Sequence, residues 1–140
     1  MTNTGVPSRA VARAVMKTDL VTVTPDTPLA DAIRLLMKHR ISGLPVVDAQ
    51  QRLVGIVTEK DLLRLLYEER GVLAKAADVM STGVRAFQAD DPLELICDCL
   101  MANHFRRVPI LEGDRLVGLI SRADLMPTIL DLAAEYVSDS

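Results

Sequence analysis

The stretch LVGIVTEKDLL, at residues 53–63, returns at residues 116–126 as LVGLISRADLM. Further pairs follow in the same order in both halves of the chain: VMKT and VMST (15–18 and 79–82), PL (28–29 and 92–93), LM (36–37 and 100–101), and PVVD and PILE (45–48 and 109–112). The spacing then shortens by one residue, because the turn DAQQR is one residue longer than EGDR. Turns tolerate such a change, so the sequence predicts one structural unit that is used twice.

Each copy predicts the same series of elements. A short β-rich run comes first, at 20–23 and at 84–87, and a Pro-Leu pair then opens a helix. Two strands joined by a polar turn follow, and a second helix begins at Thr58 or at Ser121. The apolar stripes of the first helices are expected to be Leu29, Ile33, Leu36 and Met37 in the first copy, and Leu93, Cys97, Leu100 and Met101 in the second.

The predicted fold is therefore α/β (α+β), with two tandem β-α-β-β-α repeats. Neither repeat could bury its sheet alone, so we expect the two to pack face to face as a pseudo-two-fold pair. The predicted boundaries are 1–14 for an N-terminal segment, 15–69 for the first repeat, 70–78 for a linker, 79–130 for the second repeat, and 131–140 for a C-terminal helix end or tail.

The composition narrows the classes of function. Apolar residues make up 49% of the chain. No apolar run approaches the ~18 residues that cross a bilayer. The net charge of −3 and the pI of about 5.3 argue against general binding of nucleic acids. The start of the chain, MTNTGVPSR, lacks the apolar region of a secretory signal, so we expect a cytoplasmic protein with no membrane partner.

The apolar content also predicts a homodimer. So many aliphatic residues on so small a protein indicate that some of them lie at a subunit contact. In the helix at 93–103, Leu95 and Cys99 form the expected second apolar face for this contact.

The repeated turn, TEKD at 58–61 and SRAD at 121–124, allows two interpretations. A hydroxyl residue three positions before an acid is typical of a capping box at the start of a helix. The same groups also suit a ribose-phosphate, because the free N–H groups of a helix start attract phosphate and a carboxylate can accept both ribose hydroxyls. The spacing alone leaves both interpretations open.

The order of these motifs resembles the CBS domain, and two of them in tandem resemble a Bateman module. The motifs are VM, then PL, then a hydrophobic residue followed by PVV, and finally LVG with TEKDL or SRADL downstream. The resemblance covers residues 15–69 and 79–130. It implies a stand-alone regulatory module that binds an adenosine-containing ligand, such as AMP, ADP, ATP or S-adenosylmethionine, in clefts between its repeats. The signal would pass to an unknown effector protein.

The resemblance also implies which residues hold the ligand. In the family the acid of the turn holds the ribose, and the hydroxyl residue helps with the ribose or the phosphate. Carried over to this chain, those residues are Asp61 with Thr58, and Asp124 with Ser121.

The two expected sites differ in charge. In the family, two positions before the hydrophobic-Pro pair often carry His or Arg, which reach phosphates bound by the other repeat. Arg106 and Arg107 would serve the Asp61 site in this way, whereas Ser42 and Gly43 offer no charge to the other site. Lys60 is a possible substitute cation there, and a solvated strand edge is the alternative for the arginine pair. We therefore expect phosphorylated ligands to fill the Asp61 site first.

Contacts to the base are implied along the first strand and the hydrophobic-Pro strand of each repeat. Gln88-Ala89 stands where the first copy has Thr24-Pro25, which sets the second adenine pocket apart from the first. The same apolar residues would equally suit a plain core. They are Thr22, Val23, Leu44, Pro45 and Val46 in the first copy, and Ala86, Phe87, Val108, Pro109 and Ile110 in the second.

Two other classes of function compete with this one. An enzyme would need a phosphate loop or a nucleophile elbow, which the sequence lacks, and neither His39 nor His104 recurs in the other copy. We therefore expect no catalysis. Cys97 and Cys99 point to different sides of a helix, so we expect that they form no metal site and no disulfide. The remaining alternative is a ligand-free structural or dimerisation module, in which the turn acids serve only as caps.

Overall fold

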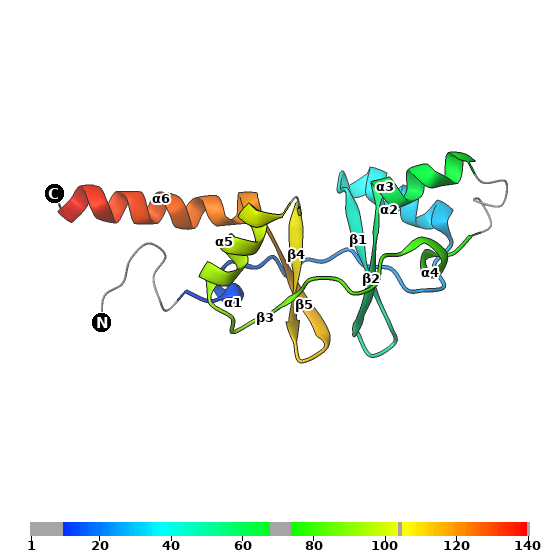
Figure 1. Cartoon of the computed structure of the whole chain (residues 1–140), viewed down its shortest axis with the longest axis horizontal. Coiled ribbons are helices and arrows are strands. Elements are labelled where there is room, and N and C mark those ends of the chain that lie inside the picture. Colours follow the sequence, from blue (N-terminus) through cyan, green and yellow to red (C-terminus); the bar gives the residue numbers. More distant parts are fainter. Residues whose placement is uncertain (1–9, 68–73, 104, 140) are drawn as a thin grey trace. The chain divides into compact units, whose positions relative to one another are not determined.

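The computed structural model describes residues 10–67, 74–103 and 105–139, and for residues 66, 132 and 135–139 it describes the backbone alone (Figure 1). The expected N-terminal segment up to residue 9, residues 70–73 of the expected linker, His104 and Ser140 lie outside the described residues. None of the described helices is long and apolar enough to cross a membrane.

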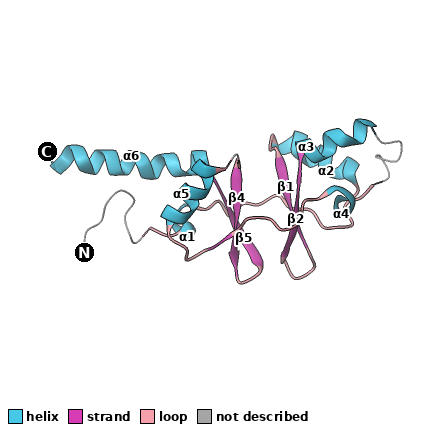
Figure 2. Ribbon diagram, in the orientation of Figure 1, coloured by secondary structure: helices cyan, strands magenta, loops and turns pink. Residues whose placement is uncertain are grey.

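The elements follow the predicted order, with extra short helices. They are α1 (Ala12–Val15), α2 (Leu29–His39), β1 (Gly43–Val47), β2 (Leu53–Thr58), α3 (Glu59–Leu63), the 3₁₀ helix η1 (Arg64–Tyr67), α4 (Ala76–Val79), β3 (Phe87–Gln88), α5 (Leu93–Ala102), β4 (Arg107–Glu112), β5 (Arg115–Ser121) and α6 (Arg122–Asp139). Helices and strands mix in each half of the chain, which confirms the predicted α+β class (Figure 2).

The chain forms two compact units. The first-repeat unit consists of Val21–Val84 and Asp114–Leu116. The second-repeat unit consists of Arg85–Gly113, Val117–Ser140 and the described part of Met1–Leu20. Each unit therefore takes up the start of the other repeat: α1 and Met16 join the second-repeat unit, and α4 and Met80 join the first.

The sheet of the first-repeat unit is an antiparallel pair. Strand β1 pairs with β2 in the register that sets Gly43 opposite Thr58. The β-rich run predicted at 20–23 contributes a single parallel bridge, from Val23 to Val46. It ends there because the N–H of Thr24 turns to donate to Thr27 Oγ1 at 3.0 Å. The predicted first strand is thus wrong in length and right in place.

The sheet of the second-repeat unit has the order β3-β4-β5. Strand β3 covers only Phe87–Gln88, parallel to β4, whereas the sequence predicted a run from 84 to 87. The N–H of Gln88 donates to Asp91 Oδ2 at 2.7 Å, which starts the turn into α5. The second copy therefore ends its first strand in the same way as the first copy.

The first helix of each repeat buries a stripe that differs from the predicted one. Leu29 and Leu36 are buried on α2, and Leu93 and Leu100 on α5, as expected. Met37 and Met101 were wrongly assigned to the core, since they are 73% and 77% exposed. Each residue turns the helix by about 100°, so the position next to the last core leucine faces away from the sheet. Ala32 of α2 and Ile96 and Cys99 of α5 are buried although the predicted stripes did not include them. Ile33 and Cys97, which were predicted, are half-buried.

The buried position of Cys99 also corrects the second apolar face expected on α5. Cys99 is 4% exposed and packs in the core of its own unit, whereas Leu95 is 49% exposed. Burial raises the pKa of the Cys97 thiol, and the charges of Asp98 and Glu94 raise it further. Both cysteines are free.

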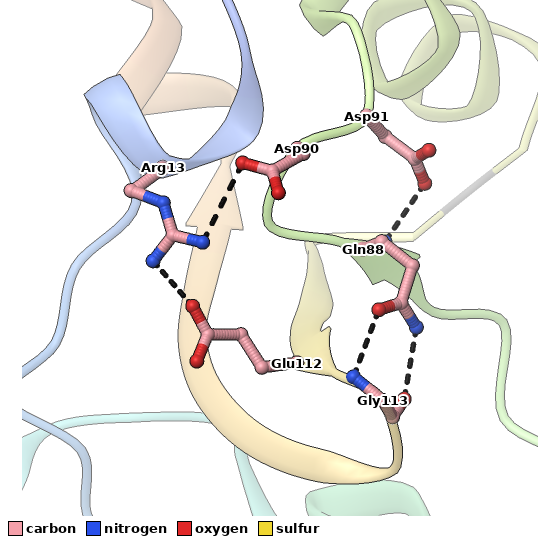
Figure 3. Close-up of polar contacts among 6 residues, drawn as sticks. All are labelled: Arg13, Gln88, Asp90, Asp91, Glu112 and Gly113. Atoms are coloured by element: carbon pink, nitrogen blue, oxygen red, sulfur yellow. Dashed lines mark hydrogen bonds and ion pairs between the residues drawn. The ribbon is translucent and has the colours of Figure 1, made fainter.

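The two hairpin turns are held by different side chains. In the longer DAQQR turn, Asp48 Oδ1 accepts from the N–H groups of Gln50 and Arg52, both at 2.9 Å. Burial opposes ionisation of Asp48, but these bonds and the Arg52 guanidinium outweigh it and lower the pKa of the carboxyl. In the shorter EGDR turn, the Gln88 amide binds both the N–H and the carbonyl of Gly113 at 2.9 Å (Figure 3).

The glycine of each LVG motif makes room for the methionine of a VM motif. A Cβ at Gly55 would lie 2.7 Å from Met80 Sδ, and one at Gly118 would lie 2.5 Å from Met16 Sδ. The methionine comes in both cases from the start of the other repeat. The two most repeated motifs of the sequence therefore pack against each other within each unit.

Replacement of Gly55 by alanine is expected to lower the free energy of unfolding by about 1–3 kcal/mol, because it overpacks this contact. The new Cβ would also meet the Ser81 carbonyl oxygen at 2.9 Å, and backbone cannot move aside as a side-chain end can. Gly43→Ala is the matched control in the same sheet, since its Cβ would meet nothing closer than 3.5 Å. Urea unfolding followed by circular dichroism measures both, and equal losses would contradict the packing argument.

Candidate functional site

The turn at Thr58 closes a capping box at the start of α3. The N–H and the Oγ1 of Thr58 both donate to Asp61 Oδ2 at 2.9 Å, and the N–H of Asp61 donates back to Thr58 Oγ1 at 3.3 Å. Asp61 is 5% exposed, and it is the only charged residue that is buried as a whole among the described residues. Its Oδ1 has no hydrogen-bond or ion-pair partner among them.

The equivalent turn at Ser121 has the same backbone geometry. The N–H of Ser121 donates to Asp124 Oδ2 at 2.8 Å, and the N–H of Asp124 donates to Ser121 Oγ at 3.3 Å. The second carboxylate oxygen is occupied in this case, because Lys17 Nζ lies 3.3 Å from Asp124 Oδ1. The Asp124 side chain is 8% exposed. The two turns thus share the hydrogen bonds made by their backbone N–H groups. They differ at the second carboxylate oxygen, which has an ion-pair partner in Asp124 and none among the described residues in Asp61.

Lys17 was not among the predicted site residues. A signal for it existed in the sequence, since VMKT and VMST match at every position but this one. The backbone of Lys17 pairs with that of Leu119, with N–H to carbonyl distances of 2.9 and 3.0 Å. This pairing sets the lysine beside the strand that leads into α6.

The structure places Ser42 and Gly43 next to the first turn. The N–H of Glu59 donates to the Ser42 carbonyl at 3.0 Å, and Gly43 lies opposite Thr58 in the sheet. Lys60 is exposed on α3. Ser42 and Gly43 thus lie beside the capping box in the first-repeat unit, and their expected role at the Asp124 site, with that of Lys60, stays a prediction.

The arginine pair belongs to the second-repeat unit. Arg106 is exposed, and Arg107 begins β4 with a half-buried side chain whose Nε has no hydrogen-bond partner. Both guanidiniums are absent from the ion pairs of the described residues. Their expected role at the Asp61 site stays a prediction from the resemblance.

Most of the predicted base contacts are core residues of their own units. Leu44, Val46 and Ile110 are fully buried, and Val108 is 1% exposed. Pro45, Pro109, Val23 and Phe87 are buried as well, while Thr22 and Ala86 are half-buried. A base could reach such residues mainly through their backbone edges, so these contacts also stay predictions.

The polar groups of the Gln88 turn form a separate network (Figure 3). Arg13 of α1 lies 2.5 Å from Glu112 and 3.5 Å from Asp90, and its bond to Glu112 raises the pKa of the guanidinium. The Gln88 side chain is engaged with Gly113. Its amide would have to leave this bond to contact a base.

The expectations about a metal site and about the two histidines concern the acidic, histidine and cysteine side chains. No group of three or more His, Cys, Asp or Glu side chains among them could hold a metal ion. His39 is exposed at the end of α2. His104 lies outside the described residues.

Comparison with known proteins gives relatives of several kinds. The inosine-5'-monophosphate dehydrogenase of Methanocaldococcus jannaschii is 35% identical over 84% of this chain, and the match spans 24% of that enzyme. The CBS domain-containing protein YhcV of Bacillus subtilis is 31% identical, over 79% of each chain. This chain therefore corresponds to about a quarter of the dehydrogenase and to most of YhcV.

A solved structure shares the fold closely. CBSX2 in complex with AMP gives a TM-score of 0.78 at 27% identity, and the match covers 88% of this chain and 98% of that chain. CBSX2 is a CBS-pair protein of Arabidopsis thaliana. The family model for the CBS domain matches residues 11–68 and again residues 76–131. With its capped turns and two matched ranges, the chain belongs to the CBS domain family and carries two such domains in tandem.

Proposed function

We propose that this chain is a regulatory module that binds an adenosine-containing ligand through the turns that open α3 and α6. The observation that carries the proposal is Asp61, a buried carboxylate whose Oδ2 is used by the cap while Oδ1 has no partner among the described residues. Oδ1 is not one of the fully buried side-chain atoms that lack a partner, so it is open to a donor from outside the chain. A ribose hydroxyl can be this donor, as carboxylates of nucleotide sites accept ribose hydroxyls.

The comparison with CBSX2 supports the class of ligand. That protein is solved with AMP, and this chain shares its fold at 27% identity. AMP joins a ribose, which suits a free carboxylate oxygen, to a phosphate, which suits cations such as Arg106, Arg107 and Lys60. The ligand proposed here is therefore an adenosine with or without phosphate.

The module acts, in this proposal, by binding and not by catalysis. The match to the dehydrogenase spans only 24% of that enzyme. A ligand would change the output of a partner protein by favouring one of two arrangements of the chain. The cytoplasmic location stays a prediction from the composition.

A homodimer is part of the proposal. Equivalent positions of the two repeats expose apolar side chains, which is costly unless something covers them. Met37 and Met101 are 73% and 77% exposed, and Leu63 and Met126 are 60% and 54% exposed. These residues replace Cys99 as the support for a contact between two copies.

A ligand-free structural module is the second candidate, and the capping boxes favour it. Both acids stabilise a helix start, so their presence has a structural reason without any ligand. On this view Oδ1 of Asp61 would be met by water alone.

Calorimetric titration of the nucleotide-stripped chain distinguishes the two candidates. We expect saturable binding of AMP and of adenosine, weaker binding of free adenine, which has no ribose, and no competition by ribose 5-phosphate at equal concentration. Thermal unfolding should shift upward with the same ligands, since binding to the folded state stabilises it. Absence of saturable binding with every adenosine ligand would favour the structural module.

A further inference from the structure

The ion pair between Lys17 and Asp124 joins the start of the first repeat to a turn of the second. Nζ lies 3.3 Å from Oδ1, and the side chains of lysine and aspartate are 73% and 8% exposed. The lysine is held from its backbone, which pairs on both sides with Leu119, while Met16 fills the space above Gly118. The position of Lys17 is therefore fixed although its ammonium reaches solvent.

Lys17 is the cation that meets Asp124. Arg122, the nearest basic residue along the chain, instead donates to the carbonyls of Leu100 and Asn103 at 2.8 and 3.2 Å. Among the described residues, no other lysine or arginine lies within ion-pair distance of this carboxylate. The charge at the second turn thus comes from one side chain.

The first-repeat unit has the same arrangement without the lysine. Ser81 stands at the equivalent position, and its backbone pairs with Ile56 at 2.8 and 3.0 Å, while Met80 lies against Gly55. The serine hydroxyl has no positive charge, and Asp61 has no ion pair among the described residues. At the position that faces the second carboxylate oxygen in the second-repeat unit, the two repeats carry Lys17 and Ser81.

We propose that Lys17 determines the ligand preference of the second-repeat site, where it discriminates against adenosine ligands that carry no phosphate. This inference rests on the proposed function. A ribose hydroxyl that binds Asp124 Oδ1 has to displace the ammonium. An uncharged adenosine offers the released ammonium nothing in return, whereas a phosphate on the same ligand gives it a new partner within reach of its flexible four-carbon stem.

The Asp61 site has no such barrier. Ser81 leaves Oδ1 open, so adenosine and AMP differ there only by the contacts of the phosphate itself. Lys17 consequently raises the ratio of the adenosine dissociation constant to that of AMP at the Asp124 site, and the Asp61 site lacks this contribution.

The test uses the full chain and reads one site at a time. In an Asp61→Ala background, titration with adenosine and with AMP reports the Asp124 site, and Lys17→Ser is expected to lower the ratio of the two dissociation constants by about fivefold, as for a partly exposed ion pair. In an Asp124→Ala background, the reciprocal Ser81→Lys is expected to raise the ratio at the Asp61 site.

Lys38→Ser is the matched control, because it removes the same charge from an exposed position of α2. It is expected to leave the ratio within twofold of the parent. Binding of both ligands with an unchanged ratio in Lys17→Ser and in Ser81→Lys overturns the inference and leaves the proposed function standing. Failure of both ligands to bind the unsubstituted chain overturns the proposed function and the inference with it.

Discussion

Replacement of Ile96 by alanine is expected to lower the free energy of unfolding by about 2–5 kcal/mol. Ile96 is fully buried on α5, and it belongs to the core that joins this helix to β4, β5 and α1 in the second-repeat unit. The substitution removes buried methylene groups and leaves a cavity that a close-packed core cannot fully close. Urea unfolding followed by circular dichroism measures the loss.

Met101→Ala is the matched control on the same helix. Met101 is 77% exposed, so its truncation is expected to change the free energy of unfolding by no more than about 0.5 kcal/mol. Alanine is a good helix former at both positions, so helix propensity does not confuse the comparison. Equal losses in the two variants would contradict the different burial of the two side chains, and a larger loss in Met101→Ala would favour the predicted stripe, which included Met101.

This pair also shows where sequence reasoning about the fold succeeds and fails. The Pro-Leu pairs predict the starts of α2 and α5 correctly: each proline is the N-cap residue, where its fixed φ and its missing N–H interrupt no helical hydrogen bond. The stripe is harder, since LLM and CLM runs offer several apolar residues in sequence. Only the position of the sheet decides which of them faces inward.

The first strands failed for a related reason. A β-rich run has the composition of a strand, but the length of a strand depends on how far a partner runs beside it. At Val23 and at Phe87 the chain turns away almost at once, because Thr24 and Gln88 donate to Thr27 and Asp91. Those side-chain bonds are local, and a Thr-x-x-Thr spacing could have signalled the first of them.

In the candidate site, too, the sequence predicted the local contacts and missed the long-range one. The reciprocal bonds of Thr58 and Asp61 lie three residues apart, so the spacing alone predicted the cap, and the structure confirms it. Lys17 reaches Asp124 across more than a hundred residues, through the pairing of its backbone with Leu119. No periodicity in the sequence signals that contact, because it depends on each unit taking up the start of the other repeat.

Asp61→Ala is expected to weaken the binding of adenosine and of AMP at the first-repeat site by at least about tenfold, and by a similar factor for both. Hydrogen bonds to a charged group contribute about 1.5–3 kcal/mol, which corresponds to roughly tenfold or more in affinity. The factor is shared because the lost partner is the ribose, which both ligands contain. Calorimetric titration in an Asp124→Ala background reads this site alone.

The same substitution also removes a helix cap, so loss of folding has to be separated from loss of binding. Asp78→Ala provides the comparison, because Asp78 Oδ2 accepts from the N–H of Lys75 at 2.8 Å and caps α4 in the same unit. Both variants are expected to lose about 1 kcal/mol of stability from the cap. Only Asp61→Ala should lose the ligand. Binding that survives in Asp61→Ala, alongside the loss of stability, would show that this buried carboxylate serves the helix start alone, which is what the structural module requires.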